Sequence, residues 1–130
     1  MFSKRTLQNN VRALVAPLKD TKTVTVLVLF GVGSRYEQEK INGISHFLEH
    51  LFFKGTKRRP RAGEINRIMD GMGAEHNAFT SKEVTGFWIK SATRHFDRAL
   101  DVVSDILINP IFQPEEIEKE RGVILQEISM

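Results

Sequence analysis

The sequence contains no cysteine. This absence excludes disulfide bonds, a thiolate zinc finger and a cysteine nucleophile. Histidine and carboxylate side chains are then the only strong metal ligands, and the chain has 4 histidines beside 16 acidic residues. Any metal site must be built from this small set.

Long hydrophobic runs are also missing. The longest largely apolar stretch, residues 24–30, is far shorter than the roughly 20 residues of a transmembrane helix. The N-terminal segment MFSKRTLQNN lacks the apolar region and the small-residue cleavage site of a secretory signal. We therefore expect no membrane association and a cytoplasmic location in a bacterium, unless a targeting segment has been removed.

The net charge of +3 is modest, and much of it falls in one short basic run. The run has no interleaved aromatic residues, and no helix-turn-helix or RNA-binding signature accompanies it. We interpret it as a solvated loop and expect no nucleic-acid binding. Its members are Lys54, Lys57, Arg58, Arg59 and Arg61.

Alternating or β-branched apolar residues predict four strands in two hairpins. Residues 10–18 and 23–30 are expected to pair around the turn-like residues 19–22. Residues 75–80 and 83–91 are expected to form the second pair. The predicted sheet therefore has about four strands.

Helical spacing predicts four helices, and glycine and proline mark several of their ends. Because the helices alternate in pairs with the hairpins, the order ββααββαα indicates an α+β domain with helices on one face of a mixed or antiparallel sheet. The expected helices cover residues 43–53, 62–72, 93–109 and 114–130.

A single domain suits the length of 130 residues and the 41% hydrophobic content. The last predicted helix is still running at Met130. We therefore expect residues 1–130 to be one N-terminal catalytic segment of a longer protein.

The strongest motif is His46-Phe47-Leu48-Glu49-His50, which has the form H-x-x-E-H. At about 100° per residue, Glu49 lies about 60° from His46 and His50 about 40° on its other side, so the three share one helix face. The apolar residues of the segment lie opposite. Histidines at this spacing can bind one metal ion while the glutamate reaches its water. The alternative is an ordinary solvated polar face.

A catalytic zinc site usually has three protein ligands and one open position, so a third ligand must come from elsewhere. The last predicted helix offers Glu120 and Glu127, seven residues apart and hence on one face. Glu127 also lies at the edge of an apolar stripe, where a carboxylate needs a cation nearby. A zinc ion would supply this cation, and so would the side chain of Arg121 or Lys119.

Four segments carry a resemblance to a known family and cover most of the chain in that family's order. They are GSRYE (33–37), GISHFLEHLFFKGT (43–56), MGAEHNAFTSKEVT (72–85) and IEKERGVILQEI (117–128). The sequence resembles the pitrilysin/insulinase family of zinc metallopeptidases, the inverzincins, and especially its processing proteases.

The resemblance implies one Zn²⁺ per chain and a zinc-dependent endopeptidase that acts on extended polypeptides. His46, His50 and Glu127 would be the metal ligands, and Glu49 the general base. Glu120 matches a second acid of the catalytic machinery, one that supports the site without binding the metal. The substrate would add as a strand along Asn77, Ala78 and Phe79.

Members of this family are much longer and close a second half over the substrate. The resemblance therefore implies pairing, as a homodimer or with a second homologous half or subunit, and weak or absent activity for this segment alone. The alternative function is that of a non-catalytic core or assembly subunit with the same fold. Cobalt or manganese would also suit the proposed ligands.

Overall fold

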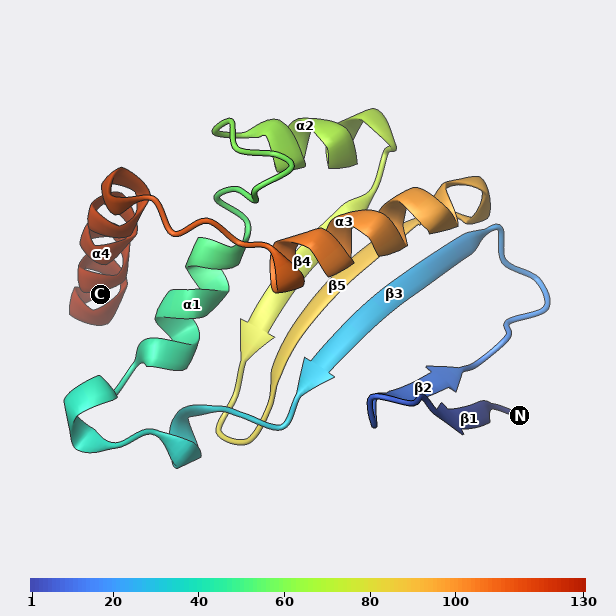
Figure 1. Ribbon diagram of the computed structural model, residues 1–130, viewed down its shortest axis with the longest axis horizontal. Coiled ribbons are helices and arrows are strands. Elements are labelled where there is room, and N and C mark those ends of the chain that lie inside the picture. Colours follow the sequence, from blue (N-terminus) through green and yellow to red (C-terminus); the bar gives the residue numbers. More distant parts are fainter.

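A three-stranded antiparallel sheet runs through the centre of the computed structural model, which describes residues 1–130 (Figure 1). Its strands are β3 (Thr23–Phe30), β5 (Thr85–Ala92) and β4 (Glu75–Thr80), in that spatial order. β5 is the middle strand, and its Ile89 lies opposite Val26 of β3 and His76 of β4. The predicted pairing of residues 75–80 with residues 83–91 is confirmed.

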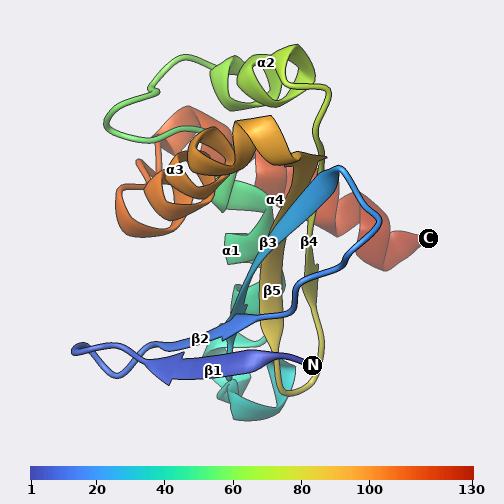
Figure 2. The ribbon, with the colours of Figure 1, turned by 90° about the vertical axis from the view of Figure 1, so that its right-hand side faces the viewer.

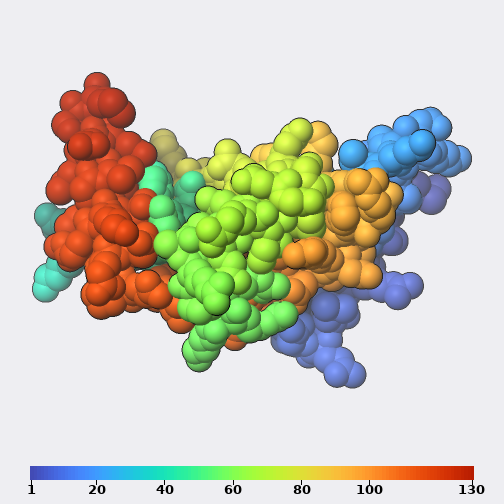
Figure 3. Space-filling view, turned by 90° about the horizontal axis from the view of Figure 1, so that it is seen from above, coloured from blue at the N-terminus to red at the C-terminus, as the bar shows by residue number.

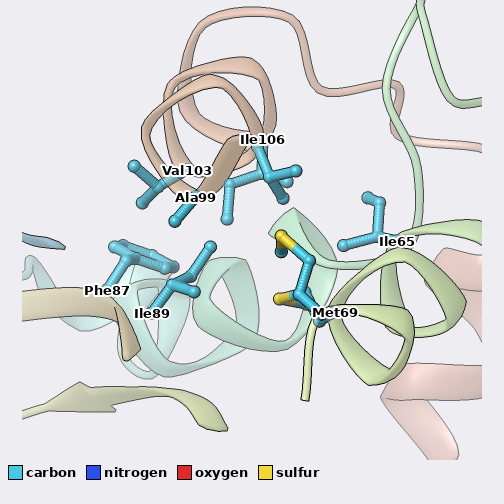
Figure 4. Packing of buried hydrophobic residues seen from close by; sticks show 9 residues of the cluster. Ile65, Met69, Phe87, Ile89, Ala99, Val103 and Ile106 are labelled. Atoms are coloured by element: carbon cyan, nitrogen blue, oxygen red, sulfur yellow. The ribbon is translucent and has the colours of Figure 1, made fainter. Parts of the chain in front are cut away.

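One face of this sheet carries the hydrophobic core (Figure 4). Side chains of β5 point there toward α2 (Glu64–Gly71) and α3 (Phe96–Ile108). Full burial of an apolar side chain of this kind contributes roughly 1.5–3 kcal/mol. The nine buried members of the core are Ile65, Met69, Met72, Phe87, Ile89, Ala99, Val102, Val103 and Ile106.

The helix α1 (Ile44–Phe52) packs on the same face, where the rings of Phe52 and Phe87 lie 5.2 Å apart. On the opposite face Leu27 and Leu29 are exposed. The expectation of an α+β fold with helices on one face of an antiparallel sheet is therefore confirmed.

The predicted first hairpin is wrong. β2 (Arg12–Val15) pairs with β1 (Ser3–Thr6) and not with β3, so the two form a separate sheet whose strands run across those of the main sheet (Figure 2). The main sheet consequently has three strands rather than four. The missed signal is Asn10, which has a φ of 64° in the turn between β1 and β2. Asparagine tolerates this left-handed conformation better than most residues.

The four predicted helices are present, with α4 (Pro114–Ser129) as the last of them. α4 packs against α1, while the N-terminal strands lie at the opposite end of the molecule (Figures 1 and 3). Three short 3₁₀ turns cover Ser34–Tyr36, Glu39–Ile41 and Thr93–His95. None of the helices has the length and apolar character needed to cross a membrane.

The basic run is less solvated than the sequence suggests. Arg59 is 12% exposed and forms ion pairs with Asp101 and Asp105 of α3. Arg58 also pairs with Asp101, at 2.7 Å. Local charge patterning could not reveal these partners, because they lie more than 40 residues away along the chain. Intramolecular pairing thus accounts for part of the positive charge.

The loop that follows α1 is held to α3 through Asp105. This carboxylate is 1% exposed, and it accepts hydrogen bonds from the Thr56 hydroxyl at 2.6 Å and from the Asn109 amide at 3.0 Å. Burial raises the pKa of Asp105. The two hydrogen bonds and Arg59 lower it by more than burial raises it, so the net pKa lies below the usual value. The buried carboxylate therefore fixes the loop after α1 to α3.

Candidate metal centre

The helix α1 begins at Gly43, whose φ of 91° favours glycine. Gly43 has no side chain with which to cap the helix. Instead Glu37 accepts hydrogen bonds from the Gly43 N–H at 2.6 Å and the Ser45 N–H at 2.8 Å. Burial raises the pKa of Glu37, whereas the two backbone bonds lower it, and the net pKa lies below the usual value. A carboxylate at this end also complements the helix dipole.

The metal-ligating atoms of His46, His50 and Glu127 lie within 4.8 Å of one another. The two Nε2 atoms of the histidines are 3.1 Å apart. Glu127 Oε2 lies 3.6 Å from Nε2 of His46 and 3.9 Å from Nε2 of His50. The packing of α4 against α1 brings this carboxylate, distant in sequence, to the histidine pair (Figure 1).

These separations fit a zinc ion. Zinc–nitrogen and zinc–oxygen bonds of about 2.0–2.2 Å in a tetrahedron place neighbouring donors about 3.3–3.6 Å apart. Two imidazoles and one carboxylate also match the ligand types of catalytic zinc and leave a fourth position open. The residues present can therefore hold such an ion with only small side-chain adjustments.

Glu120 orients His50 from the side remote from the donor cluster. Its Oε2 lies 3.1 Å from Nδ1 of His50, so a proton on Nδ1 leaves the Nε2 lone pair free for a metal. Its other oxygen pairs with Lys54. Burial raises the pKa of Glu120, but Lys54 and His50 lower it, and the net pKa falls below the usual value. The carboxylate thus stays ionised although it is only 6% exposed.

Glu49 is not part of the donor cluster, although it shares the helix face of the histidines. Its Oε2 accepts a hydrogen bond from the hydroxyl of Thr80, the last residue of β4. No other hydrogen bond or ion pair of the Glu49 side chain is present. Its second oxygen is therefore free for another partner.

The three residues expected to meet a substrate lie on β4, which is an edge strand. Asn77 and Phe79 are exposed, whereas Ala78 is half-buried on the core side. The Ala78 N–H donates to the side chain of Asn77 at 2.9 Å. β4 also contacts α1. An open strand edge therefore lies beside the helix that carries His46, Glu49 and His50.

Three residues that support this site are not among the site residues predicted from the sequence: Glu37, Lys54 and Thr80. Lys54 had a partial signal, because it follows His50 by four residues, about one helical turn, although it lies just past the end of α1 at Phe52. Glu37 and Thr80 had none, because each reaches α1 from a different segment. All five residues proposed from sequence for the metal and its chemistry lie on the facing helices α1 and α4.

The chain is similar to proteins of a known family. The insulinase family (peptidase family M16) matches residues 13–130. The chain is 43% identical over 130 residues to the uncharacterized zinc protease YmxG of Bacillus subtilis, covering all of this chain and 32% of that protein. It is 47% identical over 106 residues to the mitochondrial-processing peptidase subunit beta of Caenorhabditis elegans, covering 82% of this chain and 23% of that protein.

A solved structure is similar as well. The crystal structure of a protease from Helicobacter pylori superposes with a TM-score of 0.91 at 35% identity, over 98% of this chain and 30% of that one. The chain thus spans a third or less of the length of these relatives. Because the family match extends over nearly the whole sequence, the chain belongs to the insulinase family of peptidases.

Proposed function

We propose that this chain forms the zinc-binding part of an endopeptidase that hydrolyses extended polypeptides. The observation that carries the proposal is the approach of Glu127 to within 3.9 Å of both histidine Nε2 atoms. The name of the relative YmxG, a zinc protease, supports the choice of metal. We propose one ion per chain, held by His46, His50 and Glu127.

The chemistry that a bound zinc ion supplies is polarisation of the scissile carbonyl and a lowered pKa of the attacking water. Glu49 takes a proton from that water on its free carboxylate oxygen and returns it to the leaving amine. Glu120 keeps the His50 ring in the orientation that directs Nε2 toward the metal. No covalent intermediate with the protein is needed.

The edge strand β4 supports an extended substrate. A peptide that adds beside Asn77, Ala78 and Phe79 would form backbone hydrogen bonds along the open edge. Such recognition depends first on hydrogen bonds to the substrate backbone and second on its side chains, and it requires that the substrate segment be unfolded. We propose a polypeptide substrate for this reason. We also propose that the chain pairs, as a homodimer or with a second homologous half or subunit, and that it has a cytoplasmic location in a bacterium.

Metal content is the decisive test. Purified wild-type protein at its natural length should contain close to one zinc per chain by mass spectrometry of its metals, and His50→Ala and Glu127→Ala should each lose it. Glu118→Ala, at an exposed position of α4, is the matched control and should keep it. A metal-free wild type, or a zinc-loaded protein inactive on any unfolded peptide, would instead favour a non-catalytic assembly subunit.

A further inference from the structure

Thr80 joins the strand edge to the general base proposed above. It is the last residue of β4, and its hydroxyl donates a hydrogen bond to Oε2 of Glu49 on α1. The two residues are 31 positions apart, so the contact depends on the packing of β4 against α1. Thr80 forms no hydrogen bond with His46, His50 or Glu127.

The orientation of the Glu49 carboxylate depends on this bond. A glutamate side chain has several rotatable bonds and samples many rotamers when nothing restrains it. Glu49 has no ion pair and no other hydrogen-bond partner. With Oε2 held by Thr80, the other oxygen is left to accept a proton from a water molecule at the metal.

Burial alone does not explain the contact. Thr80 is half-buried, so its hydroxyl could be satisfied by water instead. Thr85, its partner directly across the sheet, shows the structural alternative: its hydroxyl donates to the backbone carbonyl of Val32 at 2.8 Å and not to a carboxylate. Neighbouring threonines thus use their hydroxyls differently, and only Thr80 reaches a residue proposed to react.

We propose that Thr80 is a positioning residue that holds the Glu49 carboxylate in its proton-accepting orientation. Thr80 directly follows Phe79 on the strand that would bind the substrate. The bond therefore ties the position of the general base to the strand beside which the scissile bond lies. This role rests on the peptidase function proposed above.

The test compares Thr80→Val with Thr80→Ser in the zinc-loaded protein at its natural length. Valine keeps the shape and strand preference of threonine without the hydroxyl, whereas serine keeps the hydroxyl. For an unstructured fluorogenic peptide, we expect Thr80→Val to lower kcat about 10- to 100-fold, because small misplacements of reacting groups cost about that much. KM and zinc content should stay within about twofold, and Thr80→Ser should keep most of kcat.

Crystal structures provide a readout that does not depend on turnover. The Glu49 carboxylate should leave its wild-type position in Thr80→Val and keep it in Thr80→Ser. Thr85→Val is the matched control and should not reproduce the loss of kcat. If the wild type is active and Thr80→Val is equally active or loses its zinc, the positioning role of Thr80 is disproved. The peptidase proposal is not affected by that result. An inactive wild type would overturn the peptidase proposal and the role of Thr80 with it.

Discussion

Three side chains on one face of α1 differ in what they contact. His46 and His50 lie beside Glu127, while Glu49 is held by Thr80 instead. A carboxylate that shares the face of the ligands but stands outside their cluster is placed to act on a water molecule rather than on the metal. This difference separates the two roles and makes them testable one at a time.

Glu49→Gln should abolish most turnover while zinc still binds. The amide has nearly the size of the carboxylate, and its oxygen can still accept the hydrogen bond from Thr80. It cannot take a proton at neutral pH, and general-base catalysis typically contributes about 10²- to 10⁴-fold. Peptide cleavage and metal content, measured on the same samples, check the prediction. Turnover close to wild type would disprove the role assigned to Glu49.

At the residue scale, helix periodicity was sufficient to select His46, Glu49 and His50, because all three lie within five positions of one another. Periodicity also placed Glu120 and Glu127 on one face of a second helix. It could not identify Thr80, since the contact of a strand end with a helix depends on tertiary packing. The catalytic and ligand roles themselves remain predictions.

At the scale of elements, the start of α1 depends on a residue outside the helix. Gly43 cannot cap its own helix, and the Glu37 carboxylate accepts from the first N–H groups instead. The helix that carries the proposed ligands therefore begins at a fixed place relative to the preceding loop. Loss of this cap should loosen the first turn, which includes His46.

Glu37→Ala should lower the free energy of unfolding by about 1 kcal/mol, the usual cost of losing a helix cap. Glu39→Ala is the matched control, because Glu39 lies in the same segment and its exposed side chain forms no hydrogen bond or ion pair. Urea denaturation of both variants beside the wild type would measure the difference. Equal stability of the two variants would mean that Glu37 does not anchor the helix.

The strands show why element type was easier to predict than element pairing. Alternation identified β3 and β5, but β3 pairs with β5, whose residues lie 55 to 69 positions away, and not with its neighbour in sequence. A strand pattern contains no information about its partner unless a turn signal joins the two. Asn10 was such a signal for β1 and β2, and it lay inside the segment predicted as a strand.

At the scale of the whole molecule, the proposed metal site lies between the helices α1 and α4. α1 belongs to the core, whereas α4 packs mainly against α1 and supplies Glu127. A metal bound by all three residues would link α4 to the core and stabilise that arrangement. The core side of the site is held in turn by Asp105, which fixes the loop after α1.

Acid should weaken the whole fold partly through Asp105. The pKa of this carboxyl in the folded protein lies below its usual value, because hydrogen bonds from Thr56, Asn109 and Arg59 outweigh the effect of burial. In the unfolded chain the carboxyl has a pKa of about 3.9 and binds the proton more readily. The stabilisation is therefore fully present above that value and is lost as the pH falls through the lower, folded pKa.

Asp105→Asn removes this titration, so its unfolding free energy should be lower than that of the wild type at pH 7 and should change less as the pH falls from 5 to 2. Removing the charge also leaves Arg59 with only the more exposed Asp101. Asp101→Asn is the control, because Asp101 is 40% exposed and solvent screens its ion pairs. Urea denaturation across the pH series would decide the matter. Parallel curves for wild type and Asp105→Asn would show that the buried carboxylate does not link acid to unfolding.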